Sequence, residues 1–179
     1  MRKEIQIAGF GGQGVVLGGT ILGKAAALYD GCEAVLTQAY GPEARGGASS
    51  SSLVISDELI DYPFVQHPDV LVVLSQEAYT KFRPEASQDA FILIDEGLVT
   101  PWDDDRVYRI PATRLAEEMG QRRVANVIML CFLTALTGLV SRQAMEKAIE
   151  TTVKAKTVPV NLRAFAAGYE YVGVGEHSE

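Results

Sequence analysis

The amino-acid sequence predicts one α/β domain with a mostly parallel sheet and helices on both faces. Apolar segments of strand length alternate with segments of helical spacing along most of the 179 residues. Two of the short segments, 70–74 and 91–94, are continuously apolar, which is typical of strands covered on both sides. A glycine-rich turn over residues 9–14 joins the first expected strand to the first expected helix.

The chain begins with an expected β-α-β unit. We expect a strand over 3–9, a helix over 13–30 and a second strand over 34–39. Gly31 follows the helix and suits the left-handed conformation that ends many helices. The glycines inside this helix weaken it intrinsically, and we expect them to allow close approach of helix and sheet.

Further strands complete the expected sheet, over 49–56, 70–74, 91–94 and 107–110, with a helix over 76–86. The four serines that begin segment 49–56 resemble a linker, but they continue directly into Leu53-Val54-Ile55. We therefore expect a strand whose small side chains lie under close neighbours. The acidic run Asp103 to Asp105 is expected to be a solvated surface loop and not a site.

The rest of the chain is expected to be helical, over 112–120, 126–137, 141–152 and 160–171. Asn126 and Ser141 are placed as N-caps of their helices. The tail, 173–179, is expected to be mobile. No repeat or domain boundary is visible, so the expectation is a single Rossmann-like domain over 1–179 with a helical C-terminal part.

Composition excludes several classes of function. The formal net charge is −7 and no basic run occurs, which argues against a nucleic-acid binder. No segment approaches ~18 uninterrupted apolar residues, and no signal peptide is recognisable, so no membrane span is expected. The two cysteines, Cys32 and Cys131, are far apart and supply neither a disulfide framework nor a metal or Fe–S site. A cytoplasmic location is the simplest expectation.

The glycine turn is the clearest candidate for a binding site. Gly9, Gly11 and Gly14 have the spacing G-x-G-x-x-G, and Gly12 is an additional glycine. Such a turn brings backbone N–H groups to a helix N-terminus, where a phosphate or pyrophosphate binds. A nicotinamide-binding turn would also need an acid at the end of the second strand. The residues there, Thr37-Gln38-Ala39-Tyr40, contain none, which disfavours a dehydrogenase.

No residues suggest a self-sufficient active site. The two histidines are His67, before a proline and best interpreted as a turn residue, and His177, in the tail. No serine lies in a G-x-S-x-G elbow. Cys131 lies in an apolar helix and is expected to pack, while Cys32 has no obvious activating neighbour. These observations predict a binding subunit, with no catalytic residue and no metal ligand.

Several separate motifs, in order, resemble the gamma subunit of 2-oxoacid:ferredoxin oxidoreductases. They are Gly11-Gly12-Gln13-Gly14, Tyr40-Gly41-Pro42-Glu43-Ala44-Arg45-Gly46-Gly47, Ile60-Asp61-Tyr62-Pro63, Pro68-Asp69 and Leu74-Ser75-Gln76-Glu77-Ala78-Tyr79. The likeness covers essentially the whole chain. The Tyr40 to Gly47 segment and the later Ser-Gln-Glu-Ala are most similar to the 2-oxoglutarate (KorC-type) branch.

The resemblance implies a subunit of a complex that converts 2-oxoglutarate and coenzyme A to succinyl-CoA and CO2, with ferredoxin as electron acceptor. Thiamine diphosphate, Mg2+ and 4Fe-4S clusters are implied in alpha, beta and delta partners, and the gamma chain alone is expected to be inactive. The gamma chain is implied to help bind coenzyme A. We expect Gly11, Gly12, Gln13 and Gly14 to cradle phosphate, Arg45 to supply a cation or order its loop, and Asn126 to offer a polar contact.

Three alternatives remain at this point. The chain could serve an enzyme for pyruvate or branched-chain 2-oxoacids. It could be a purely structural subunit that docks on partners through exposed apolar residues around Phe10 and Phe64-Val65. A free-standing nucleotide-binding oxidoreductase is the least favoured.

Overall fold

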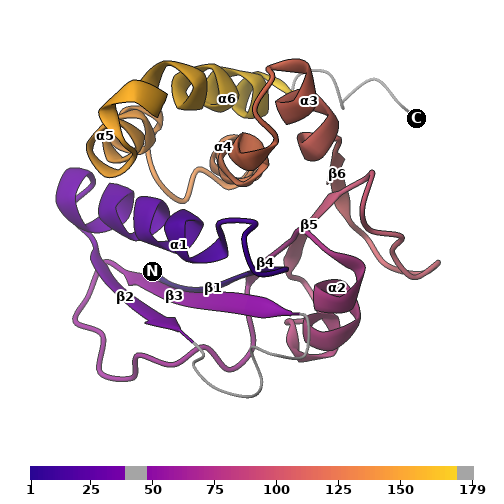
Figure 1. The fold of residues 1–179 in the computed structure, drawn as a ribbon. Helices are drawn as coiled ribbons and strands as arrows, with labels where there is room; N and C mark the ends of the chain where they lie inside the picture. Colours follow the sequence, from indigo (N-terminus) through magenta and orange to yellow (C-terminus); the bar gives the residue numbers. More distant parts are fainter. Residues whose placement is uncertain (39–47, 173–179) are drawn as a thin grey trace.

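A six-stranded sheet with the strand order β2-β3-β1-β4-β5-β6 runs through the computed structural model (Figure 1). The structure describes residues 1–38 and 48–172. The strands are β1 (Arg2–Gly9), β2 (Glu33–Gln38), β3 (Ser49–Ser56), β4 (Val70–Val73), β5 (Phe91–Asp95) and β6 (Tyr108–Ile110). Only β3, among the described strands, runs antiparallel to its neighbours, so the prediction of a mostly parallel sheet is confirmed.

The first two strands run parallel but are not adjacent. Strand β3 lies between them and pairs antiparallel with both, so that Leu53 is opposite Ile5 on β1 and Leu36 on β2. The expected β-α-β unit is therefore present, but β3 lies between its two strands, β1 and β2. The C-terminal ends of β1 and β4 lie side by side at the centre of the sheet, because these two strands pair in parallel.

The helices are close to their expected positions. They are α1 (Val15–Lys24), α2 (Gln76–Phe82), α3 (Ala112–Glu118), α4 (Ala125–Thr137), α5 (Arg142–Thr152) and α6 (Val158–Glu170). Helix α1 continues as the π-helical turn η1 (Ala25–Tyr29), and Gly31 then adopts φ +70° as predicted. Ser141 caps α5, since its hydroxyl accepts a hydrogen bond from Ala144 N at 3.2 Å.

The two faces of the sheet are covered unequally (Figure 1). Helices α1 and α3 to α6 cover one face, and α2 covers the other. Alternation along β1 fits this division, because Ile5 and Ile7 face the larger core and Ala8 the smaller one. Helix α4 lies inside the larger core, which explains why its residues are buried on almost every side. Within the described residues, no helix has the length and apolar character to span a bilayer.

Small residues let α1 approach the sheet closely. A Cβ atom added at Gly19 would lie 2.7 Å from Ser51 Oγ and 2.8 Å from Leu36 Cδ1. The Ser51 hydroxyl donates a hydrogen bond to the carbonyl of Val15 at 2.8 Å. The expectation of a strand with small side chains under close neighbours is therefore confirmed.

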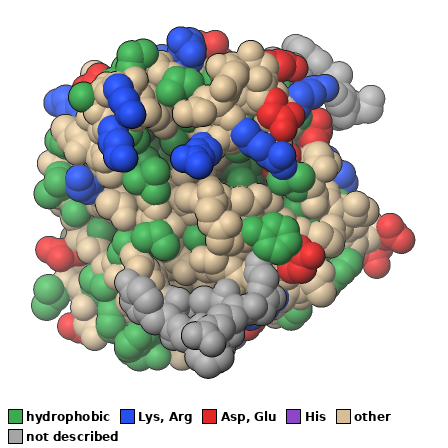
Figure 2. Space-filling model, in the orientation of Figure 1, with side chains coloured by type: hydrophobic (Ala, Val, Ile, Leu, Met, Phe, Trp, Pro, Cys, Tyr) green, Lys and Arg blue, Asp and Glu red, His purple; other side chains and the backbone are tan. Residues whose placement is uncertain are grey.

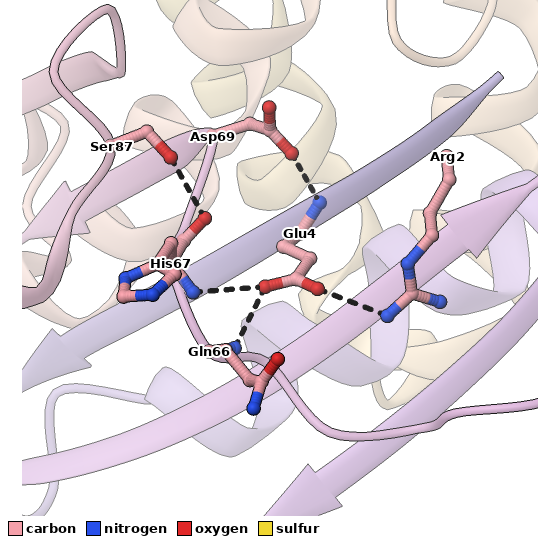
Figure 3. A network of polar contacts seen from close by, with 6 residues as sticks. All are labelled: Arg2, Glu4, Gln66, His67, Asp69 and Ser87. Atoms are coloured by element: carbon pink, nitrogen blue, oxygen red, sulfur yellow. Dashed lines mark hydrogen bonds and ion pairs between the residues drawn. The ribbon is translucent and has the colours of Figure 1, made fainter.

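The connection between β3 and β4 is fastened to the start of β1 (Figure 3). The Glu4 carboxylate accepts hydrogen bonds from the backbone N–H groups of Gln66, at 2.7 Å, and His67, at 3.1 Å. It also pairs with Arg2, at 3.0 Å. The His67 ring contacts the carbonyl of Glu85 at 3.3 Å, which agrees with a turn residue. This network lies at the end of the sheet opposite the glycine turn, which follows the other end of β1.

The expectation that all three residues of the acidic run are solvated is wrong for Asp105. Its side chain is only 7% exposed and forms a bidentate interaction with Arg83, with Nε 2.7 Å from Oδ2 and Nη2 2.6 Å from Oδ1. The Tyr79 hydroxyl also donates to Asp105. Asp103 and Asp104 are exposed, as expected. Asp105 therefore fixes this loop onto α2.

This cluster makes stability depend on pH. Burial opposes ionisation, but the hydrogen bonds from Arg83 and Tyr79 prevail and lower the pKa of the Asp105 carboxyl. The unfolded chain consequently takes up a proton at Asp105 at higher pH than the folded chain does. The stabilisation is present at neutral pH and is lost as the pH falls below about 5. Burial and the Asp105 hydrogen bond raise the pKa of Tyr79 to about 12.

We expect Asp105→Asn to lower the free energy of unfolding by about 1–3 kcal/mol at pH 7, because Arg83 loses its anion. The variant should also lose less stability than the wild type between about pH 5 and pH 3, the range that surrounds the ordinary aspartate pKa of about 3.9. Urea unfolding at several pH values measures both effects. Asp103→Asn is the control and should behave as wild type. If the unfolding free energy of Asp105→Asn fell with decreasing pH as steeply as that of the wild type, the pH dependence would not come from Asp105.

Candidate functional site

The candidate site lies where the connections of the sheet change direction. From β1 the chain passes into α1 and toward the β2 edge, whereas from β4 it passes into α2 and toward the β6 edge. Helices α1 and α2 cover opposite faces, so a crevice opens between the ends of these two parallel strands. In open α/β sheets, ligands bind at such a switch point. The glycine turn and Leu74 lie there.

The crevice has a volume of about 270 Å3 and is formed by segments distant in sequence. It is lined by Gly12, Gln13, Leu74, Thr113, Arg122, Arg123 and Ala125. Arg122 and Arg123 are the only charged residues in this lining among the described residues. The crevice is thus cationic, although the chain as a whole is acidic.

Gln13 holds the glycine turn in shape. Its side-chain Oε1 accepts a hydrogen bond from Phe10 N at 2.5 Å, and its Nε2 donates to the carbonyl of Leu74 at 2.8 Å. Its own backbone N–H donates to the carbonyl of Phe10 at 3.2 Å. A Cβ atom at Gly9 would lie 2.5 Å from Gln13 Oε1, so a larger residue here would displace the Gln13 amide from this position. Gln13 therefore ties the turn to β4.

The remaining glycines of the turn differ in whether the fold itself favours glycine at their position. Gly12 and Gly14 have φ values of +89° and +75°, a conformation that favours glycine. A Cβ atom at Gly14 would also lie 2.5 Å from Asn126 Nδ2. At Gly11 neither constraint applies: its φ is not in this region, and no described atom would lie within 4 Å of an added Cβ. Nothing in the described chain itself requires glycine at position 11.

The turn leads into a helix end with free donors. Gly14 is the N-cap of α1, and no side chain of the described residues caps this end. The intrahelical hydrogen bonds begin at Gly18 N, which donates to the carbonyl of Gly14 at 2.8 Å. The N–H groups of Val15, Val16 and Leu17 have no intrahelical acceptor, and the helix dipole adds positive potential at the same place. This arrangement can bind an anion.

Asn126 joins α4 to the glycine turn and does not cap its own helix. The prediction of an N-cap is wrong, because the 3-10 turn η4 (Arg122–Val124) precedes α4 and puts Asn126 inside its first turn. The Asn126 Nδ2 donates to the carbonyl of Gly14 at 3.0 Å, and its Oδ1 accepts from Val127 N at 2.8 Å. The side chain therefore fixes the N-terminal end of α1 against that of α4. Arg45 lies outside the described residues.

Sequence reasoning missed the arginine side of the crevice. Arg122 and Arg123 lie in the turn η4 just before the apolar helix α4, and an adjacent basic pair before a buried helix was the available signal. Thr113, also in the lining, is fixed by Asp95, whose Oδ2 accepts from Thr113 N at 2.8 Å and Oγ1 at 2.6 Å. Figure 2, which has the orientation of Figure 1, shows Lys and Arg side chains on the upper half of the visible face, above the region of α1.

No described residue outside the crevice forms a convincing reactive centre. Cys131 is fully buried, and burial raises the pKa of its thiol, as expected for a packing residue. Cys32 is half-buried. Within residues 1–38 and 48–172, no group of three or more His, Cys, Asp or Glu side chains is arranged to hold a metal ion.

Comparisons with known proteins agree with one family. Residues 4–171 match the family model for pyruvate ferredoxin/flavodoxin oxidoreductase. The chain is 55% identical over 175 residues to 2-oxoglutarate synthase subunit KorC of Methanocaldococcus jannaschii, covering 95% of this chain and 94% of the relative. The crystal structure of a keto/oxoacid ferredoxin oxidoreductase gamma subunit from Geobacter sulfurreducens matches with a TM-score of 0.89 at 38% identity, covering 97% and 98% of the two chains.

A more distant solved structure shares the fold. It is 2-oxoglutarate:ferredoxin oxidoreductase from Magnetococcus marinus with 2-oxoglutarate, coenzyme A and succinyl-CoA bound. The TM-score is 0.84 at 22% identity, and the match covers 97% of this chain and 31% of that longer chain. The α/β fold with its helical C-terminal part therefore also occurs as one portion of a larger polypeptide.

Proposed function

The chain belongs to the pyruvate ferredoxin/flavodoxin oxidoreductase family, and on this premise we propose that it is the gamma subunit of a 2-oxoglutarate:ferredoxin oxidoreductase. The choice of 2-oxoglutarate rests on full-length similarity to a 2-oxoglutarate synthase subunit. Service in an enzyme for pyruvate or branched-chain 2-oxoacids is the alternative. An anoxic assay of coenzyme A-dependent ferredoxin reduction by the purified complex, with each 2-oxoacid in turn, distinguishes them.

Within that complex, the subunit binds a phosphate-bearing part of coenzyme A at the glycine turn. The observation that carries this proposal is the open backbone of Gly11 and Gly12 beside the uncapped N-terminus of α1. Gly14 forms the N-cap, while Gln13 and Asn126 act by holding the turn in position. Arg45 remains a candidate from its sequence motif alone.

The size of the crevice limits what this chain binds. Pockets for drug-sized ligands usually measure about 300–1,000 Å3. The volume here is about 270 Å3, which suits a phosphate or pyrophosphate and not a whole coenzyme A molecule. The rest of the molecule, including the thiol that accepts the acyl group, would extend toward neighbouring subunits.

The other components of the reaction are assigned to partner chains. Thiamine diphosphate with Mg2+ would supply the decarboxylation chemistry and 4Fe-4S clusters the path of electrons to ferredoxin. We place these groups in alpha, beta and delta subunits. For the clusters the reason is that this chain has only two cysteines, far apart in sequence, whereas a 4Fe-4S cluster is held by four. A complex of this kind would work in the cytoplasm.

Hydrogen exchange of the purified complex, with and without coenzyme A, tests the binding role. We expect coenzyme A to slow amide exchange in residues 10–17. The β3–β4 connection at the opposite end of the sheet is the internal control and should not respond. If saturating coenzyme A leaves 10–17 unchanged, the chain is a structural docking subunit. Phe10 and Phe64 are exposed, and they are the apolar side chains through which such a subunit would dock on its partners.

A further inference from the structure

We propose that Arg122 and Arg123 form an anion clamp that makes this site selective for a phosphorylated thiol substrate over its unphosphorylated analogue. The inference rests on the proposed coenzyme A role and adds the residues and the chemical property that the site recognises. Glycine turns bind phosphate through N–H dipoles, whereas guanidinium groups add full charges and paired donors. The two kinds of group share one crevice here.

The position of the arginines supports a direct contact with the same phosphate group. Arg122 and Arg123 line the crevice together with Gly12 and Gln13 of the glycine turn. No Asp or Glu belongs to this lining in the described part of the chain. An anion in the crevice would therefore meet positive groups on both sides, namely the N-terminal end of α1 and the two guanidinium groups.

The two arginines of the clamp lie next to a part of the backbone that is packed in the core. The arginines lie in η4, and the following Val124 and Ala125 are buried in the core at the start of α4. Asn126 fixes this part of α4 to the glycine turn through its 3.0 Å hydrogen bond to Gly14. The backbone that carries each side of the crevice is thus positioned before any ligand binds, while the two exposed arginine side chains can adjust to the ligand.

The two arginines differ in their partners. Arg122 Nη1 lies 3.6 Å from Glu117 Oε1, and both side chains are largely exposed, so this pair is weak. Arg123 forms no ion pair or side-chain hydrogen bond with residues 1–38 or 48–172, although it is adjacent to the crevice. Arg123 can therefore turn to a ligand without breaking an existing interaction, and we expect it to have the larger effect.

Steady-state kinetics of the purified complex test the clamp with Arg123→Gln and the double variant Arg122→Gln/Arg123→Gln. We expect KM for coenzyme A to rise about 10-fold in the single variant and more in the double variant, with kcat retained. The KM for pantetheine, which has no phosphate, should stay unchanged. The rise of KM with added salt should become less steep, because fewer charges act on the ligand.

Two control variants distinguish the loss of positive charge in the crevice from other effects of replacing an arginine. Arg123→Lys keeps the charge and should recover part of the affinity, whereas Arg163→Gln removes an exposed arginine of α6 and should have no effect. Hydrogen exchange of the wild-type complex gives a readout without mutation. We expect coenzyme A to protect residues 120–125, and pantetheine not to protect them.

The outcomes distinguish this inference from the proposed function. If coenzyme A protects 10–17 but not 120–125, or if the Gln variants bind coenzyme A as wild type does, the clamp is wrong and the proposed function stands. If coenzyme A protects neither segment, the proposed function itself fails. Should the Gln variants not join the complex, the exchange measurement on the wild type decides between these results.

Discussion

Gly168→Ala is expected to lower the free energy of unfolding by about 3 kcal/mol. Gly168 lies in α6 where this helix packs on α4. An added Cβ atom would lie 2.2 Å from the carbonyl oxygen of Ile128 and 3.0 Å from its carbonyl carbon. These are backbone atoms of a buried helix, so the two helices must move apart to relieve the overlap.

A loss of stability in Gly168→Ala would indicate close packing of α6 on α4. Replacing glycine by alanine in a helix interior ordinarily stabilises the helix by up to ~1 kcal/mol, so a loss cannot come from helix propensity. Urea unfolding followed by circular dichroism measures the change. Gly97→Ala, in the turn after β5, is a control for the added methyl group alone: its Cβ would meet no described atom closer than 3.6 Å, and its stability should stay within about 0.5 kcal/mol of wild type. A Gly168→Ala protein as stable as this control would show that the helices are not in close contact.

Local patterns predicted the elements of the fold but not every neighbour. Residues 70–74 and 91–94 were recognisable as buried strands because continuous apolar character is a property of the segment itself. The insertion of β3 between β1 and β2 depends on pairing between Leu53 and residues far away in sequence. No local signal specifies such an order, and the same holds for the contact of Gly168 with α4.

In the candidate site, too, local features could be predicted from the sequence, whereas features that depend on tertiary packing could not. The glycine turn was predicted from its spacing, since the conformations of Gly12 and Gly14 are local requirements. The arginine side was missed because η4 reaches the crevice only through the packing of α4 against α1. The prediction that Asn126 caps its own helix is wrong, because the acceptor of its side-chain amide, the carbonyl of Gly14, lies 112 residues away in sequence.

Gly11→Ala should raise KM for coenzyme A by about 100-fold while leaving the fold intact. An added methyl group at this position would meet no described atom within 4 Å, so the unfolding free energy should change by less than about 0.5 kcal/mol. A ligand phosphate lying against the backbone would meet that methyl group, and crowding of this kind costs about 2–3 kcal/mol. Such a cost corresponds to a loss of affinity of roughly 30- to 150-fold.

The comparison with Gly14→Ala makes the argument specific. That variant should be both destabilised and defective, because the added Cβ would lie 2.5 Å from Asn126 Nδ2 and the residue has φ +75°. Gly11→Ala separates ligand binding from folding, which alanine at Gly9, Gly12 or Gly14 cannot do, because these positions have a close contact or a positive φ. The measurements are the melting temperature of the chain, recovery of the complex and KM for coenzyme A. Normal melting with a raised KM supports a ligand at Gly11. Normal melting with failed assembly would instead place a partner subunit there, and an unchanged KM in a complete complex would exclude close approach of coenzyme A to this glycine.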